Sequence, residues 1–125
     1  MANPPNIVNV AQIFGTTETT KLDSTSAIEI MPAVATNYTH KINQIFVANI
    51  HGTNASDLDI YIAENTTNTY LVKTITIPAD SSMALISSPI YLSYNATGTG
   101  NRLMAQAQYA DYIDVIVSYE KITDV

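Results

Sequence analysis

The segment Leu58–Ala63 has the sequence LDIYIA, and its most apolar residues recur at every second position. In an extended strand, Leu58, Ile60 and Ile62 share one face, and the side chains between them share the other face. This alternation is typical of an antiparallel sheet that packs one face on a core and turns the other away from it. The segment therefore predicts a β-sheet protein.

The same alternation recurs along the rest of the chain. We predict strands over residues 7–14, 28–30, 41–50, 58–63, 70–77, 83–86, 90–92, 102–109 and 112–122. Turn-forming residues fill 51–56, 64–68 and 95–101, and residues 15–26 fit either a long loop or a polar edge strand. We expect no helix. The fold class is all-β, an antiparallel β-sandwich or a jelly roll of about eight short strands.

Length and composition limit the function classes. The chain has 125 residues, which fits a single domain over 1–125, with residues 1–6 as an extended N-terminal arm that holds Pro4 and Pro5. Only 13% of the residues are charged and the net charge is −6, whereas soluble domains average about 25% charged residues. The five basic residues are scattered, so we expect no nucleic-acid partner and no membrane partner. The absence of a signal-peptide pattern predicts synthesis in a cytoplasm.

Few residues suggest catalysis or metal binding. His40 and His51 lie at opposite ends of the predicted strand 41–50, roughly 35 Å apart, so we expect two separate surface histidines. Asp57 and Asp59, predicted to flank a turn, are of a type that binds Ca²⁺, but Asp is equally common as a turn residue. With no cysteine and no catalytic motif in the sequence, we predict no enzyme activity, no cofactor and no metal site.

The candidate residues are therefore those of an interaction surface. Tyrosine is enriched at interfaces, and Tyr61 is predicted to point away from the apolar face of its strand. The N-terminal arm is predicted to lie across a neighbouring subunit, and the turns 51–57 and 95–101 are expected to be exposed tips. The candidate interaction residues are Ala2, Asn3, Pro4, Pro5, Asn6, Ile7, Tyr61 and Tyr94.

Between residues 7 and 122 the chain resembles a group of known proteins. The similar segments are 13–16 (IFGT), 41–49 (KINQIFVAN), 52–55 (GTNA), 58–62 (LDIYI), 76–80 (TIPAD) and 117–120 (VSYE). In their order and character they resemble the small β-sandwich virion structural proteins of tailed phages, especially marine ones. These motifs are architectural and carry no catalytic chemistry.

The resemblance implies a non-enzymatic component of a virion. Proteins of this kind include capsid decoration (cement) proteins, which bind capsomer junctions, partner the major capsid protein and are often trimers. A neck, head–tail connector or tail-associated subunit is a second interpretation. A glycan-dependent or Ca²⁺-dependent receptor-binding module is a third, in which the loops of the same sandwich carry the function.

Overall fold

The computed structural model describes residues 10–94 and 100–124. Its strands are β1 (Val10–Lys21), β2 (Ile28–Met31), β3 (Tyr38–Asn49), β4 (Ser56–Glu64), β5 (Thr67–Ile77), β6 (Ser81–Ala84), β7 (Ile90–Ser93), β8 (Arg102–Ala107) and β9 (Ile113–Asp124). Within these ranges the chain forms no helix, and accordingly no helix there could cross a membrane. The predicted all-β class is confirmed.

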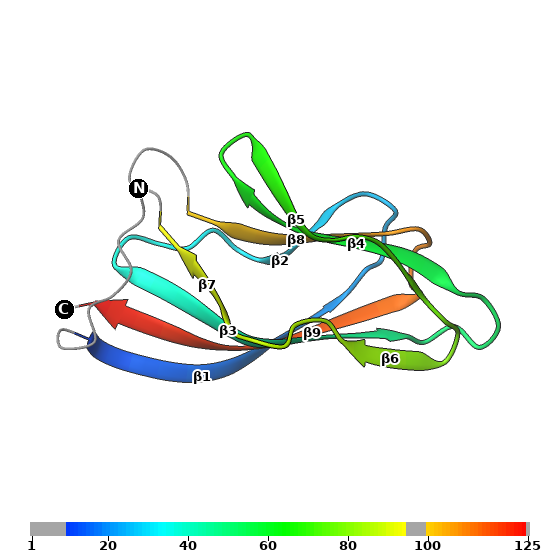
Figure 1. Cartoon of the computed structure of the whole chain (residues 1–125), viewed down its shortest axis with the longest axis horizontal. Coiled ribbons are helices and arrows are strands. Elements are labelled where there is room, and N and C mark those ends of the chain that lie inside the picture. Colours follow the sequence, from blue (N-terminus) through cyan, green and yellow to red (C-terminus); the bar gives the residue numbers. More distant parts are fainter. Residues whose placement is uncertain (1–9, 95–99, 125) are drawn as a thin grey trace.

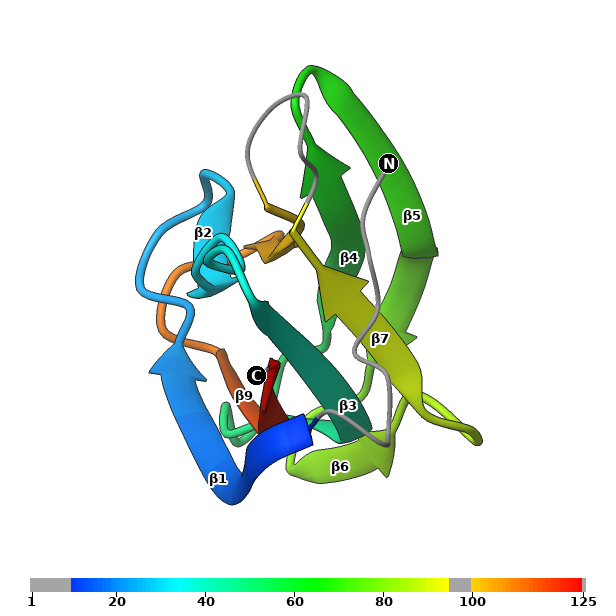
Figure 2. The same cartoon turned by 90° about the vertical axis from the view of Figure 1, so that its left-hand side faces the viewer.

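The strands form two antiparallel sheets that lie one above the other in Figure 1. Sheet A has the order β1-β9-β3-β6, and β7 also pairs with β3. Sheet B has the order β2-β8-β4-β5. Figure 2 shows β7 beside β3 and β5 outside β4.

The order of the strands identifies a jelly roll. β6 and β7 pair with opposite ends of β3, so they act as two halves of one interrupted strand. The pairing is then nested: β1 with β9, β2 with β8, β3 with β6 and β7, and β4 with β5. A long antiparallel ribbon rolled into two facing sheets has this order, which is the jelly-roll arrangement. The sequence had left a plain sandwich and a jelly roll open, and the topology selects the jelly roll.

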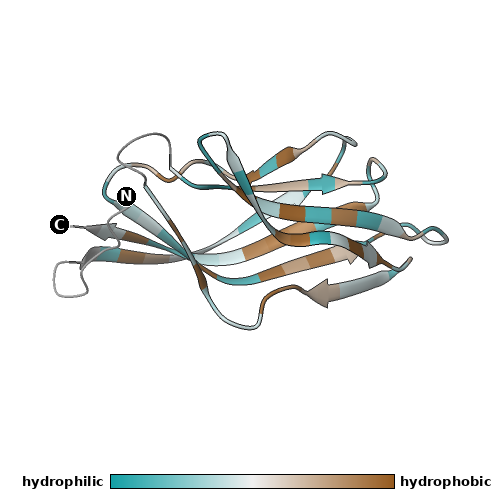
Figure 3. Ribbon diagram, turned by 45° about the horizontal axis from the view of Figure 1, so that its top comes forward, coloured by the Kyte–Doolittle hydropathy of each residue, from teal (hydrophilic) through white to brown (hydrophobic). Residues whose placement is uncertain are grey.

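The core lies between the sheets and is built from alternate residues of each strand. β3 contributes Ile42, Ile45 and Val47, and every other strand except β1 adds at least one buried or partly buried apolar side chain in its described part. The predicted core face of the last strand is confirmed, since Ile113, Val115, Val117 and Tyr119 are all buried. Figure 3 shows the resulting alternation of hydrophobic and hydrophilic residues along the strands.

The polar stretch after residue 14 is mostly an edge strand. β1 continues to Lys21 and pairs with β9 along its length, and the loop follows only after that residue. Of the two predicted alternatives for residues 15–26, the polar edge strand is therefore correct up to Lys21. The threonines of this stretch favour the extended backbone because they are β-branched.

Gly100 fits a backbone contact that a larger residue would break. A Cβ atom at Gly100 would overlap the backbone of Val34, whereas one at Gly15 would meet nothing within 4 Å. Next to Gly100, the amide of Val34 donates a hydrogen bond to the carbonyl of Asn101 at 3.3 Å. This contact ties the segment after β2 to the start of β8.

We predict that Gly100→Ala lowers the free energy of unfolding by about 2 kcal/mol or more, because the backbone of one segment must move. Gly15→Ala is the matched control and is expected to stay within about 0.5 kcal/mol of the original chain. Urea denaturation of both variants measures the difference. Equal stability of the two variants would contradict the close approach at Gly100.

Candidate functional site

The predicted interaction residues fall in different places. The arm residues Ala2–Ile7 and the tip residues 95–99 lie outside the described residues. Tyr94 follows β7 directly and is half-buried. In the other predicted tip, residues 52–55 are exposed, but Ser56 and Asp57 already belong to β4. The positions that can be described therefore do not form one continuous patch.

Tyr61 is on the expected face of sheet B but is not free to contact a partner with its ring. It lies opposite Met104 of β8, on the side away from the core residue Ile60. Tyr70 lies against it with ring centroids 4.9 Å apart, and only 8% of Tyr61 is exposed. Tyr70 itself is 40% exposed, and Lys73 Nζ lies 4.4 Å from its ring centroid. The accessible member of this aromatic pair is Tyr70.

The outer face of sheet A carries an apolar row that sequence analysis missed. Phe46 of β3 lies directly opposite Ile116 of β9, and the two side chains are 44% and 38% exposed. Thr19 of β1 and Ala84 of β6 continue the row on either side. The sequence does carry a signal for it, because Ile45-Phe46-Val47 and Val115-Ile116-Val117 are runs of three apolar residues. In a strand, such a run places its middle residue on the outside.

Two ion pairs lie on the same outer face, one on each side of the apolar row. Lys21 Nζ is 2.8 Å from Asp114 Oδ1, and Lys41 Nζ is 3.7 Å from Glu120 Oε1. Each pair joins residues in register on neighbouring strands. Exposed pairs of this kind add only about 0–1 kcal/mol to stability, so their main effect here is to cancel charge.

We call this surface the neutral face. It consists of the described outward side chains of sheet A, in which two lysines are balanced by Asp114 and Glu120. The remaining members are Ser, Thr, Asn, Gln, Ala, Gly, Tyr, Ile and Phe. The whole chain carries a net charge of −6, so the neutral face differs from the average surface of the molecule. An interface core is depleted of unpaired charge in the same way.

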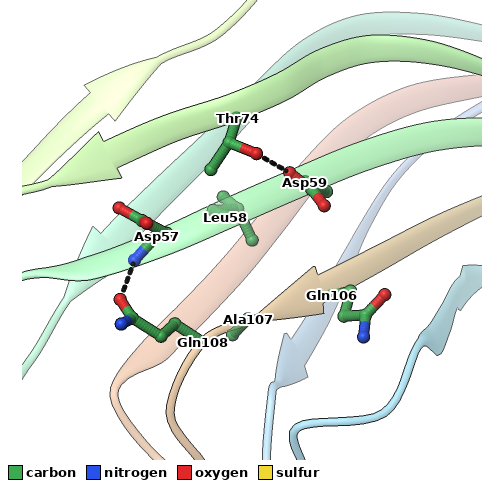
Figure 4. Close-up of a pocket in the computed structure, with 7 residues that line it drawn as sticks. All are labelled: Asp57, Leu58, Asp59, Thr74, Gln106, Ala107 and Gln108. Atoms are coloured by element: carbon green, nitrogen blue, oxygen red, sulfur yellow. Dashed lines mark hydrogen bonds between the residues drawn. The ribbon is translucent and has the colours of Figure 1, made fainter.

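Sheet B has a more polar outer face with a shallow pocket (Figure 4). Asp57 and Asp59 of β4 line it together with Thr74 of β5 and the amides Gln106 and Gln108. Polar groups that line the pocket form hydrogen bonds with one another. Thr74 Oγ1 donates to Asp59 Oδ1 at 2.8 Å, and the amide of Asp57 donates to Gln108 Oε1 at 3.0 Å.

The strand begins earlier than predicted. Asp59 lies within the strand, as the prediction over 58–63 has it, but Asp57, expected in the turn 51–57, also lies within β4. Thr76 Oγ1 also donates to Asp57 Oδ1, at 2.6 Å, so the threonines of β5 serve as the hydrogen-bond partners of both carboxylates. Within the described residues, no group of three or more His, Cys, Asp or Glu side chains is placed to hold a metal ion.

The two histidines have different environments, although they lie at opposite ends of β3 as expected. His51 is stacked on Tyr112 with ring centroids 4.1 Å apart, and its Nδ1 accepts hydrogen bonds from the amides of Thr53 and Asn54. It therefore stabilises the turn before β4. His40 is buried rather than on the surface, and this part of the prediction was wrong, because position 40 is on the inner face of β3.

His40 belongs to a small group of titratable residues at one end of the core. Its ring centroid lies 5.2 Å from that of Tyr119, whose hydroxyl donates to Glu18 Oε2 at 3.3 Å. Burial, and secondarily the positive charge of Lys121, lowers the pKa of His40 from 6.5 to about 4. Burial and then the carboxylate of Glu18 raise the pKa of Tyr119. Both rings are therefore uncharged at pH 7.

This arrangement does not form a nucleophile–base pair. Such a pair requires a hydrogen bond between the two groups, but the buried Nδ1 atom of His40 has no hydrogen-bond partner. The neutral imidazole contributes to the packing of the core. Protonation would place a positive charge in this buried position and would destabilise the folded state.

Comparisons with known proteins identify the fold. No protein-family model matches the chain, and no curated protein matches it. A chain of the Bacillus endospore appendages, which form disulfide-linked pili, aligns with a TM-score of 0.51 at 13% identity, covering 90% of this chain and 89% of that chain. This likeness shows a shared fold.

Two viral structures align more distantly. The virus-like particle of the extra small virus of the giant freshwater prawn Macrobrachium rosenbergii gives a TM-score of 0.41 at 10% identity, covering 98% of this chain and 84% of that one. Infectious bursal disease virus Gt strain gives a TM-score of 0.34 at 9% identity, covering 93% of this chain and 32% of that one.

We predict that the stability of the protein falls as the pH falls from 6.5 to 4 because of His40. In this range the unfolded state binds a proton that the folded state does not, so unfolding is favoured by up to about 1.4 kcal/mol per pH unit. Below the folded pKa the loss is complete. Chemical denaturation at a series of pH values measures this slope.

In His40→Gln the free energy of unfolding is expected to lose the pH dependence that His40 contributes between pH 6.5 and 4. His51→Gln is expected to keep it. Carboxylates contribute equally to all three proteins and cancel in the comparison. An unchanged slope in His40→Gln would contradict the assignment, even if that variant is less stable at every pH.

Proposed function

We propose that this chain is a non-enzymatic structural subunit of a virion, acting as a capsid decoration protein that binds at capsomer junctions. The observation that carries the proposal is the neutral face, with its exposed Phe46–Ile116 row between two ion pairs. The apolar side chains of this surface gain from burial, and the pairing of its charges avoids the larger cost of burying an unpaired charge. It therefore suits a lasting contact between proteins.

The jelly roll is consistent with a subunit of a large assembly. The Bacillus appendage chain of similar fold belongs to disulfide-linked pili. Residues 1–125 contain no cysteine, so these residues cannot be joined between copies by disulfides. The neutral face provides one such contact, and the arm Ala2–Ile7 and Tyr94 are proposed to add others to a neighbouring subunit.

In this proposal the partners are the major capsid protein and further copies of the chain. A trimer is the arrangement of copies that the resemblance favours, and a two-fold dimer is the alternative. Several copies that bind together gain avidity, so each single contact can be weak. A neck, connector or tail-associated subunit would use the same kind of surface in a smaller number of copies.

The number of copies per particle tests the proposal. Quantitative mass spectrometry of purified particles gives the ratio of this chain to the major capsid protein. Hundreds of copies would support decoration of the shell, and roughly a dozen would move the chain to the neck or tail. Absence from particles would overturn the virion proposal and favour the receptor-binding module.

We predict that Phe46→Glu and Ile116→Glu each weaken binding to particles that lack the chain by at least about tenfold, because a charge replaces an apolar contact at the centre of the face. Leu71→Glu on β5 is the matched control, since Leu71 is 37% exposed and belongs to sheet B. Co-sedimentation with the particles measures the affinity. Equal binding by all three variants would exclude the neutral face as the contact.

A further inference from the structure

Among the described strands, β1 has the longest regular edge that is not paired with another strand. β1 is the terminal strand of sheet A and pairs only with β9. From Gln12 to Lys21 this pairing has no register shift. The side of β1 away from β9 therefore presents ten residues of regular strand, whose outward amide and carbonyl groups can accept another strand.

The other sheet edges differ from β1 in length or regularity. β2, β6 and β7 have four residues each. β5 is long, but its pairing with β4 shifts register twice, on either side of Ile60. Short strands and bulges are the usual protection against pairing between molecules. β1 has neither between Gln12 and Lys21, and this segment contains no proline.

Two large apolar side chains lie at the same edge. Ile13 and Phe14 are adjacent, so they point to opposite faces of the sheet, and they are 55% and 51% exposed. An added strand would give each of them a neighbour on its own face. The edge thus offers apolar contacts together with hydrogen bonds.

We infer that β1 pairs antiparallel with β1 of a second copy around a two-fold axis, which joins two copies of sheet A into one continuous sheet. Such pairing is self-complementary, because the same segment serves on both sides. Ten residues in each strand give about ten hydrogen bonds, which matches the usual number in a stable interface.

The charged residues of β1 are compatible with antiparallel pairing between two copies of this strand. Between Gln12 and Lys21 the charged residues are Glu18 and Lys21. With the axis at Thr17, Glu18 lies opposite Thr16, and Lys21 lies opposite Ile13. No like charges meet, and Thr17 lies opposite its own copy, a favourable cross-strand pair. Parallel pairing in register would instead bring the two Glu18 side chains together.

Edge pairing has a consequence for the neutral face. A two-fold axis perpendicular to the sheet keeps both neutral faces on the same side, where they form one wider surface. Under the proposed function, which this step assumes, that surface would bind two sites of a shell at once and gain avidity. The pairing itself does not depend on the proposed function.

Charge variants at the edge test the inference. Light scattering coupled to size-exclusion chromatography is expected to give twice the mass of the chain for the original protein. The double variant Thr17→Lys, Thr19→Lys and the double variant Thr17→Glu, Thr19→Glu should each be monomeric, because like charges meet near the axis. An equimolar mixture of the two should recover the dimer, since opposite charges then face each other.

Two further measurements distinguish the edge from the neutral face. Phe46→Glu should leave the dimer intact, and hydrogen exchange should show that amides of β1 become protected as the protein concentration rises. A monomer at all concentrations, a trimer without a two-fold axis, or dimers of both charge variants would overturn the inference. Loss of the dimer in Phe46→Glu alone would also overturn it, in favour of pairing through the neutral face. These outcomes are independent of the copy number in particles.

Discussion

Sheet A is organised around the pairing of β3 with β9. The two strands run side by side from Tyr38 to Asn49, and each also holds an outer strand of sheet A. Their register places Val47 opposite Val115 and Ile45 opposite Val117, all in the core. Because side chains alternate, the same register fixes which residues meet on the outside.

The neutral face is a direct result of that register. Phe46 meets Ile116 because the residues on either side of each are committed to the core. Lys41 meets Glu120 two rows further along, past an irregularity between Ile42 and Gln44 that adds one residue to β3. A slip of one residue in the pairing of β3 with β9 would bury the charged side chains and expose the core residues. The register that the core requires therefore also fixes the order of side chains on the outer face.

Sequence reasoning could predict the strands and their inner faces, because alternation is a local property. Leu58, Ile60 and Val117 were assigned to the core from their neighbours alone, and they are buried. It could not predict which strands are neighbours. Lys41 and Glu120 are 79 positions apart, and only the nested topology brings them together. The burial of His40 and the cover that Tyr70 gives Tyr61 also depend on contacts that periodicity does not encode.

The low charge of the chain has different effects on the two sheets. On sheet B, Asp57 and Asp59 are held by neutral threonine hydroxyls, so their negative charge is hydrogen-bonded but not cancelled. On sheet A, the outward carboxylates of Asp114 and Glu120 each have a lysine beside them. Burying sheet B against a second acidic protein would bring like charges together. The paired charges of sheet A avoid this repulsion, so an acidic copy of the chain can cover the outer face of sheet A at a lower electrostatic cost.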